Sequence, residues 1–199
     1  MSEWMDQAWR QQLKQPDPRS CGPATMVVAR MINDPAYAEL MVTGAHPSAG
    51  HTVKGDNLQE RFTAETLSLH KRVTGSKDVS GRTQLPWPQK FGTAPWAVAR
   101  QMTGTAGVKG TKYCADLIRS TDRRDALAAI LHATRNGHAT PIYVGSRWIP
   151  RHVVLVLDPD LTTYDPAAGR RLSVKTSDFL EAKLDLGGWK KPWFVVVPD

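Results

Sequence analysis

The chain has 199 residues, of which 41% are hydrophobic and 23% are charged, a balance ordinary for a globular domain that buries a core. Lys and Arg outnumber Asp and Glu by 26 to 19, so the surface favours acidic partners, but the spread of these cations along the chain argues against nucleic acid as the main ligand. The two cysteines lie far apart and no CxxC or HExxH motif occurs, which excludes a disulfide framework and predicts neither a metal nor another cofactor.

No apolar run approaches the roughly 20 residues that cross a bilayer, so we expect no membrane segment. The N-terminus carries Glu3 and Asp6 and lacks the apolar stretch of a secretory signal. We therefore expect one domain over residues 1–199 that is cytoplasmic as synthesised. A protein of this kind that acts in another cell has to be delivered there by a dedicated secretion system.

The first half of the chain reads as mainly helical. Apolar residues at helical spacing predict an amphipathic helix over residues 1–14, packed on the rest of the domain. Further helices are expected within residues 15–110, the mainly helical half, at 21–32, 36–42, 57–73 and 94–102. The stretches 43–56 and 75–92 are rich in Gly, Pro and Ser, and we expect these long loops to form walls of a substrate cleft.

Residues 111–199 form a mainly β half. A helix capped by Ser120 or Thr121 is expected to end at Asn136-Gly137, and a helical turn is expected at 177–180. Strands are predicted at 113–115, 141–144, 153–157, 162–164 and 193–197. The predicted fold class is therefore α+β, with an N-terminal helical half packed on a C-terminal antiparallel β-sheet.

The first candidate site residue is Cys21, at the start of the predicted helix 21–32. Pro16 and Pro18 hold the preceding loop extended, and Ser20 is a suitable N-cap. The unpaired N–H groups at a helix start and the helix dipole favour a thiolate over a thiol. Cys21 is therefore a candidate nucleophile.

His152 and Asp165 are the candidate general base and its orienting acid. They flank a predicted hairpin whose turn centres on residues 158–160, and folding about that turn sets His152 opposite Asp165 or its neighbour. A carboxylate beside an imidazole fixes its tautomer and steadies the imidazolium form. Brought to Cys21, this pair would complete a Cys-His-Asp triad.

Gln15 lies six positions before Cys21, on the loop that leads into the helix. Its neutral amide is a suitable donor, together with the Cys21 backbone N–H, to the oxyanion of a tetrahedral acyl intermediate. It is the fourth candidate catalytic residue.

Each of these residues also has a structural explanation. A lone cysteine is commonly a core residue, a histidine in a strand is commonly structural, and an aspartate before a proline commonly belongs to a turn. Their order and spacing together favour the catalytic explanation. We expect Cys114 to be a buried structural residue, and no carboxylate is placed across a hairpin from the remaining histidines, which are His46, His51, His70, His132 and His138.

The pattern resembles that of the papain-like cysteine peptidase superfamily: Gln15, then Cys21-Gly22-Pro23 opening a helix, then His152 and Asp165-Pro166 on later strands. It is most similar to the peptidases that process bacteriocin and peptide leaders after a double glycine. This resemblance implies a papain-like fold, with Cys21 as nucleophile, His152 as general base and then acid, Asp165 as orienter and Gln15 as oxyanion donor.

The resemblance further implies a cysteine endopeptidase that cleaves a protein or peptide substrate, with small residues such as Gly-Gly in its subsites. A stand-alone, cationic domain of this type also looks like bacterial effectors or toxins that cut the proteins of a host or competitor, and such proteins have an inhibitor or immunity protein as a partner. Two alternatives remain open at this point. A Gln deamidase or acyl-transferase would use the same triad, and a non-catalytic binding module would use the basic surface for an acidic partner.

Overall fold

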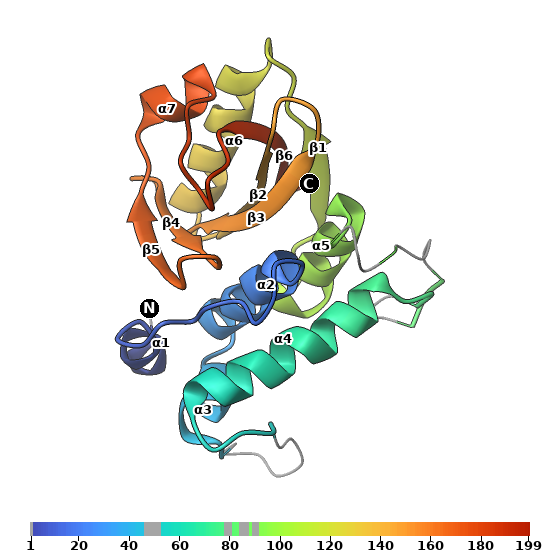
Figure 1. Ribbon diagram of the computed structural model, residues 1–199, viewed down its shortest axis with the longest axis vertical. Coiled ribbons are helices and arrows are strands. Elements are labelled where there is room, and N and C mark those ends of the chain that lie inside the picture. The colour runs from blue at the N-terminus through green and yellow to red at the C-terminus, as the bar shows by residue number, and fades with distance from the viewer. Residues whose placement is uncertain (1, 46–52, 78–80, 84–87, 89–91) are drawn as a thin grey trace.

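The computed structural model describes residues 2–45, 53–77, 81–83, 88 and 92–199. Among these residues the fold is of the mixed α+β kind, with helices in the first half of the chain and an antiparallel sheet in the second (Figure 1). The first half contains α1 (Glu3–Ala8), α2 (Cys21–Asn33), α3 (Pro35–Thr43), α4 (Leu58–Thr74), α5 (Pro95–Gln101) and the π-helical turn η2 (Met102–Ala106).

A six-stranded sheet dominates the second half, and its strand order is β1-β6-β2-β3-β4-β5. Every neighbouring pair of strands is antiparallel. The strands are β1 (Tyr113–Leu117), β2 (Thr140–Gly145), β3 (Pro150–Val156), β4 (Thr162–Asp165), β5 (Arg170–Ser173) and β6 (Lys191–Pro198), and the helices of this half are α6 (Arg123–Arg135) and α7 (Thr176–Glu181).

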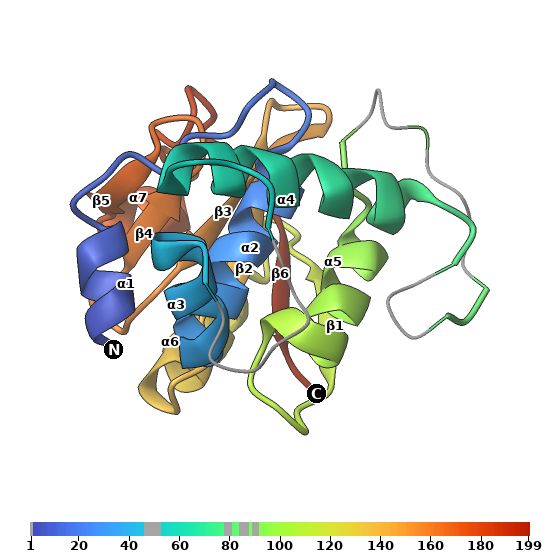
Figure 2. The same ribbon diagram turned by 90° about the horizontal axis from the view of Figure 1, so that it is seen from below.

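Helices cover both faces of the sheet, which explains why strand β3 is apolar at successive positions. Val153 and Leu155 belong to one apolar core together with α2, whereas Val154 and Val156 belong to a second core together with α6. Neighbouring side chains of a strand point to opposite faces, so a strand buried on both faces has no polar alternation. Figure 1 shows α2 and α4 on one side of the sheet and α6 and α7 on the other, and Figure 2 shows the helical side with α4 and α2 in front of the strands.

Helix α2 is the central element of the first half, because almost all of it is buried between α4, η2 and strand β3. The Thr25 hydroxyl donates a hydrogen bond to the backbone carbonyl of Val153, 3.2 Å away, and so ties α2 to β3. The helix ends where Asp34 precedes Pro35, since a residue before proline is driven to extended backbone angles. Asp34 then caps α3 by accepting a hydrogen bond from the Tyr37 N–H. The helix predicted over 21–32 is therefore confirmed.

The amphipathic helix expected over residues 1–14 is only partly present, because α1 ends at Ala8. The chain after it is held by the turn that follows β4. The Leu13 N–H donates to the Gly169 carbonyl (3.0 Å), and the Gln15 N–H donates to the Pro166 carbonyl (2.9 Å). Backbone donors that a longer helix would have used internally are therefore satisfied by a distant turn.

Two further expectations need correction, and one strand was not predicted. Helix α6 begins after Asp122, and neither Ser120 nor Thr121 is its N-cap. The helix expected to reach residue 102 passes into the π-helical turn η2 at Met102. Strand β5 was not predicted, since Arg170 and its neighbours are polar and mostly exposed, as the outermost strand of this sheet allows.

The long loops expected at 43–56 and 75–92 contain residues 46–52, 78–80, 84–87 and 89–91, which lie outside the described residues. Their suggested role as walls of a cleft therefore stays a prediction. Within the described ranges, no helix is both long enough and apolar enough to cross a membrane.

Candidate active site

Cys21 is the first residue of helix α2, and its side chain is buried, with 4% of its surface exposed. Ser20 occupies the N-cap position but its side chain does not cap the helix. Its hydroxyl instead donates to the Asp17 carbonyl, 3.0 Å away. The first hydrogen bond of the helix runs from the Ala24 N–H to the Ser20 carbonyl (2.9 Å), as the i to i−4 pattern requires, and Pro23 has no N–H.

The N–H groups of Cys21 and Gly22 therefore stand at the open end of the helix. Neither donates to an acceptor within the part of the chain that the structure describes. Gly22 packs closely against Thr93: a Cβ at position 22 would lie 2.9 Å from the Thr93 hydroxyl oxygen. The start of the helix thus combines a thiol with free backbone donors and leaves no space for a larger residue at 22.

His152 lies on strand β3 and is 5% exposed. Its Nε2 atom forms a hydrogen bond with Oδ1 of Asp165, at the end of β4, over 2.7 Å. Leu155 pairs with Tyr164 across these strands, and one further step in the same register sets Asp165 opposite Val154. The contact between His152 and Asp165 is therefore diagonal across the hairpin, and the two side chains predicted to meet do so.

The Asp165 carboxylate is satisfied from three directions. Oδ1 accepts the Ala167 N–H at 2.9 Å in addition to the His152 ring, and Oδ2 accepts the Gly187 N–H at 2.8 Å. Burial raises the pKa of Asp165, but its hydrogen bonds and the charge of His152 outweigh burial, and the pKa lies below its usual value. Asp165 is accordingly an ionised carboxylate near neutral pH.

The charge state of His152 follows from the same contacts. Burial alone lowers the pKa of this imidazole, whereas hydrogen bonds and charge interactions with Asp165 and Cys21 raise it, and the result is a pKa of about 9. Since Nε2 is engaged by Asp165, Nδ1 is the ring nitrogen that faces the thiol of Cys21. The structure thus brings Cys21, His152 and Asp165 into one connected cluster.

Gln15 is tied to the turn that carries this cluster's carboxylate, and its amide forms no hydrogen bond with Cys21 among the described residues. The Gln15 Nε2 donates to the Asp17 carbonyl over 2.8 Å, and the Gln15 Oε1 is buried with no partner among the described residues. Because its backbone N–H is bonded to the Pro166 carbonyl, Gln15 is tied to the turn that carries Asp165. The loop into α2 and the acid of the cluster are therefore held together.

Two contributions were not recognised in the sequence. The N–H groups of Ala167 and Gly187 hold the Asp165 carboxylate, and Gly187 also packs against the His152 ring. The double glycine at 187–188 marks a turn in the sequence, but nothing in its spacing relates it to residue 165.

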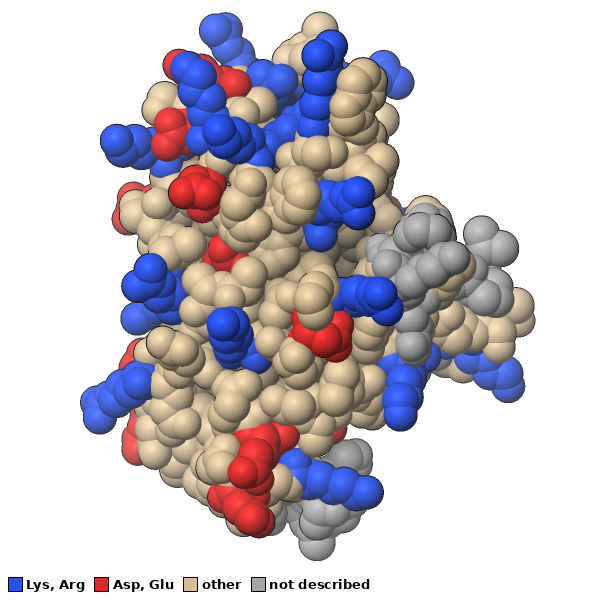
Figure 3. All heavy atoms as spheres, viewed as in Figure 1, with Lys and Arg blue, Asp and Glu red and all other residues tan. Residues whose placement is uncertain are grey.

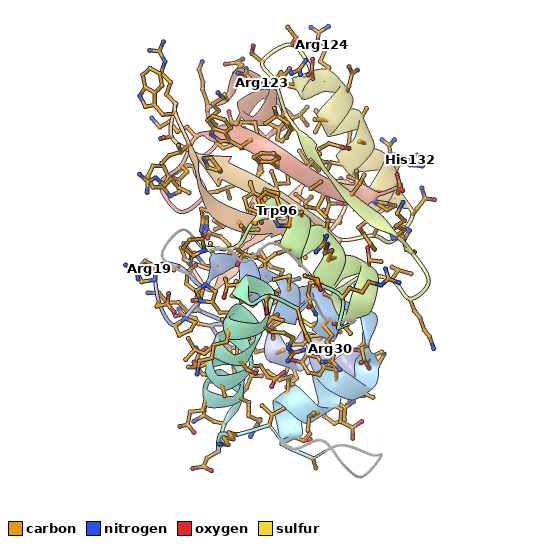
Figure 4. All side chains as sticks on the ribbon, turned by 90° about the vertical axis from the view of Figure 1, so that its right-hand side faces the viewer. Arg19, Arg30, Trp96, Arg123, Arg124 and His132 are labelled. Carbon is orange, nitrogen blue, oxygen red and sulfur yellow. The ribbon has the colours of Figure 1, made fainter. Side chains whose placement is uncertain are left out.

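The remaining histidines that the structure describes are separate from the cluster. His70 is buried on α4, where burial lowers its pKa, and Nδ1 of His138 is bonded to the Tyr113 hydroxyl at 3.0 Å. His132 is exposed on α6 (Figure 4). His46 and His51 lie outside the described residues.

Cys114 differs from the expectation of a buried residue, because it is only partly buried on strand β1. Its sulfur lies 3.8 Å from a carboxylate oxygen of Asp116 and 3.8 Å from the Val197 carbonyl. Burial and the negative charge of Asp116 raise the pKa of this thiol, so it stays protonated. The two cysteines of the chain therefore have different surroundings.

Within the described ranges, no group of three or more His, Cys, Asp and Glu residues could hold a metal ion. Comparison with protein-family models, with curated proteins and with solved structures found no match to this chain.

Proposed function

We propose that the protein is a cysteine endopeptidase that cleaves a protein or peptide through Cys21, His152 and Asp165. One observation carries this proposal: a buried imidazole is bonded to a carboxylate through Nε2 and faces a thiol at the start of a helix through its other nitrogen. Such an arrangement suits a thiolate–imidazolium pair, the activated form of a cysteine nucleophile. The packing of the nucleophile helix on an antiparallel sheet supports a papain-like architecture.

The chemistry follows from the positions of the groups. The Cys21 sulfur attacks the scissile carbonyl carbon, and the carbonyl oxygen becomes an oxyanion beside the Cys21 N–H, with the Gln15 amide as a second donor. His152 then gives its proton to the amide nitrogen, the C–N bond breaks and the amine fragment leaves. A water molecule loses a proton to His152 and its oxygen attacks the thioester carbonyl carbon. The C–S bond breaks, the acid fragment leaves, and the Cys21 thiolate and His152 imidazolium are restored.

Asp165 has a positioning role in this sequence of steps. Its three hydrogen-bond donors fix the carboxylate, and the carboxylate in turn holds the imidazole with Nδ1 toward the sulfur. The backbone N–H groups of Ala167 and Gly187 thereby orient the imidazole through Asp165, without contacting the reacting atoms.

The test begins with thiol labelling. At neutral pH, iodoacetamide should alkylate Cys21 far faster than Cys114, because only Cys21 has an imidazolium beside it. The His152→Ala variant should lose this difference, while Cys114→Ser should keep Cys21 reactive. Equal labelling of the two cysteines in the wild-type protein would contradict an activated nucleophile and would favour a binding module.

The second measurement is incubation with a proteome-derived peptide library followed by mass spectrometry. A peptidase splits peptides with a gain of one water, whereas a glutamine deamidase changes the mass by about one dalton without scission. Whichever of the two changes the wild-type protein causes must be absent in Cys21→Ala and present in Cys114→Ser. Scission after small residues would support the resemblance to double-glycine peptidases, and a mass shift without scission would replace the peptidase with the deamidase.

A further inference from the structure

A cavity of about 390 Å³ opens between the loop that joins β2 to β3 and the segment that leads into β6. Gly145, Ser146 and Arg147 line it on one side, and Gly188, Lys190 and Lys191 on the other. The indole N–H of Trp193 donates to the Ser146 carbonyl over 3.0 Å and ties the two walls together. This hydrogen bond fixes the two walls of the cavity relative to each other.

Three of the residues that line the cavity are cations, Arg147, Lys190 and Lys191. Arg147 and Lys190 are exposed, and the Lys191 ammonium lies 4.2 Å from the centre of the Trp193 ring. No described Asp or Glu side chain forms an ion pair with any of these three cations. Figure 3 shows many Lys and Arg side chains, with some Asp and Glu among them, at the upper end of the molecule, the end at which Figure 1 draws α7. A site with three uncompensated cations favours an anionic ligand.

An exposed aromatic side chain follows the cavity-lining Arg147 in the chain. Trp148 is 76% exposed at the tip of the β2–β3 loop, and the Arg147 guanidinium lies 5.0 Å from the centre of its ring. Large aromatic side chains exposed beside a cationic hollow are typical of recognition surfaces rather than of cores.

The cavity adjoins the candidate active site through one backbone segment. Gly188 lines it, and the preceding Gly187 packs against the His152 ring. On the opposite wall, Gly145 follows Val144, the residue that pairs with His152 in the sheet. Both walls are therefore extensions of the residues that hold the imidazole.

This inference rests on the proposed function, because the proposed chemistry determines which part of the substrate lies near the cavity. His152 protonates the departing amine, so the amine fragment of the substrate must lie on the imidazole side of Cys21. The cavity is lined by Gly188, the residue next to the glycine that packs against the His152 ring, and is therefore placed to contact residues that follow the cleaved bond.

We propose that this cavity binds a carboxylate of the substrate on the C-terminal side of the cleaved bond, and that Arg147, Lys190 and Lys191 make the protein prefer Asp or Glu there. A carboxylate could come from such a side chain or from the C-terminus of a short peptide. The chemistry recognised is the same in the two cases, and the test separates them.

The test uses the wild-type protein and a pool of peptides that are C-terminally amidated, with a parallel pool that carries free C-termini. Mass spectrometry of the products should show Asp and Glu enriched after the cleaved bonds in the amidated pool. For a matched pair of amidated peptides that differ only as Glu against Gln at the enriched position, kcat/KM should favour Glu by roughly 5-fold to 10-fold, and added salt should reduce this ratio. A preference seen only in the free-acid pool assigns the cavity to a C-terminal carboxylate and overturns the side-chain preference.

Arg147→Glu should bring the Glu/Gln ratio to about one or below, while the Gln peptide is still cleaved. Lys109→Glu is the matched control, because it changes the net charge equally on an exposed residue that does not line the cavity. An equal loss of preference in the control would assign the effect to overall charge and overturn the inference.

Two results separate the failure of this inference from the failure of the proposed function. Cleavage that depends on Cys21 but shows no preference for Glu over Gln would overturn the carboxylate site and leave the peptidase intact. An absence of Cys21-dependent cleavage from both pools would overturn the two together.

Discussion

Gly187 touches the imidazole of His152 so closely that no side chain fits between them. A Cβ atom at position 187 would lie 2.7 Å from Cδ2 and 2.9 Å from Nε2 of the ring, and Gly187 has a left-handed backbone with φ of +58°. The N–H of this same residue donates to Asp165. One glycine therefore sets both the space available to the imidazole and one bond of the carboxylate that holds it.

Gly187→Ala should displace the His152 ring and lower kcat by about 10²-fold or more, since a misplacement of about 1 Å has that effect at a catalytic centre. Gly137→Ala is the control, because Gly137 is also left-handed (φ +79°) but a Cβ there meets nothing within 4 Å. Both variants should lose about 1–2 kcal/mol of unfolding free energy through backbone strain. Cleavage and urea unfolding, measured together, separate ring displacement from strain, and unchanged cleavage in Gly187→Ala would contradict the close packing.

The pH dependence should show His152 losing its proton at about pH 9. A histidine whose folded pKa exceeds its unfolded value of 6.5 contributes stability that is complete below pH 6.5 and lost as the pH rises through about 9. The alkaline fall of kcat/KM should follow the same titration, because the departing amine needs this proton.

Asp165→Asn should move the His152 titration and the alkaline fall in activity to lower pH. The substitution removes the carboxylate charge and weakens the hydrogen bond, both of which raise the pKa of His152. NMR of the imidazole signals measures this shift without requiring turnover. His70, whose pKa is lowered mainly by burial on α4, should titrate alike in the two proteins. A His152 titration that stays near pH 9 in the variant would show that Asp165 does not control it.

Gln15→Ala should lower kcat by roughly 10²-fold if its amide joins the Cys21 N–H as an oxyanion donor. Gln59 offers a matched control, because its amide donates to the Lys14 carbonyl at 3.0 Å and so anchors the same loop without being placed before the nucleophile. Cleavage by Gln59→Ala should fall only slightly. Equal losses in the two variants would mean that Gln15 acts through loop anchoring alone.

Tyr164→Phe should destabilise the protein by about 1–3 kcal/mol, because the buried phenol donates to the Leu13 carbonyl, which would be left without this partner. Urea unfolding measures the loss. Amide exchange at Leu13 and Gln15 should also quicken, since the two N–H groups are bonded to the same turn region. An unchanged unfolding midpoint would show that this hydrogen bond makes no net contribution.

Local patterns in the sequence were sufficient to predict several elements and the core of the candidate site. Helix α2 matches the predicted 21–32 within a residue, because Pro35 and the apolar run before it act locally. The His152–Asp165 contact followed from a short hairpin whose turn residues are strong signals.

Other features depend on contacts between distant segments and could not be predicted locally. Residues 9–14 carry a helical pattern, yet the backbone of Leu13 bonds to Gly169, more than 150 positions away. The Gly187 N–H likewise bonds to Asp165, 22 positions away in the chain, and no turn signal links the two residues. Ser20 has the residue type of an N-cap, but Pro23 removes one of the two N–H groups that such a cap could bind, and the hydroxyl donates to the Asp17 carbonyl instead.

Strand β6 lies between β1 and β2, although it is the last strand in chain order. A nascent chain made only as far as residue 190 already contains Cys21, His152 and Asp165, but it has nothing to join β1 to the remaining strands. The six-stranded sheet is therefore continuous only when residues 191–198 are in place. A truncation before residue 191 would thus keep all three residues of the cluster and separate β1 from the strands that carry His152 and Asp165.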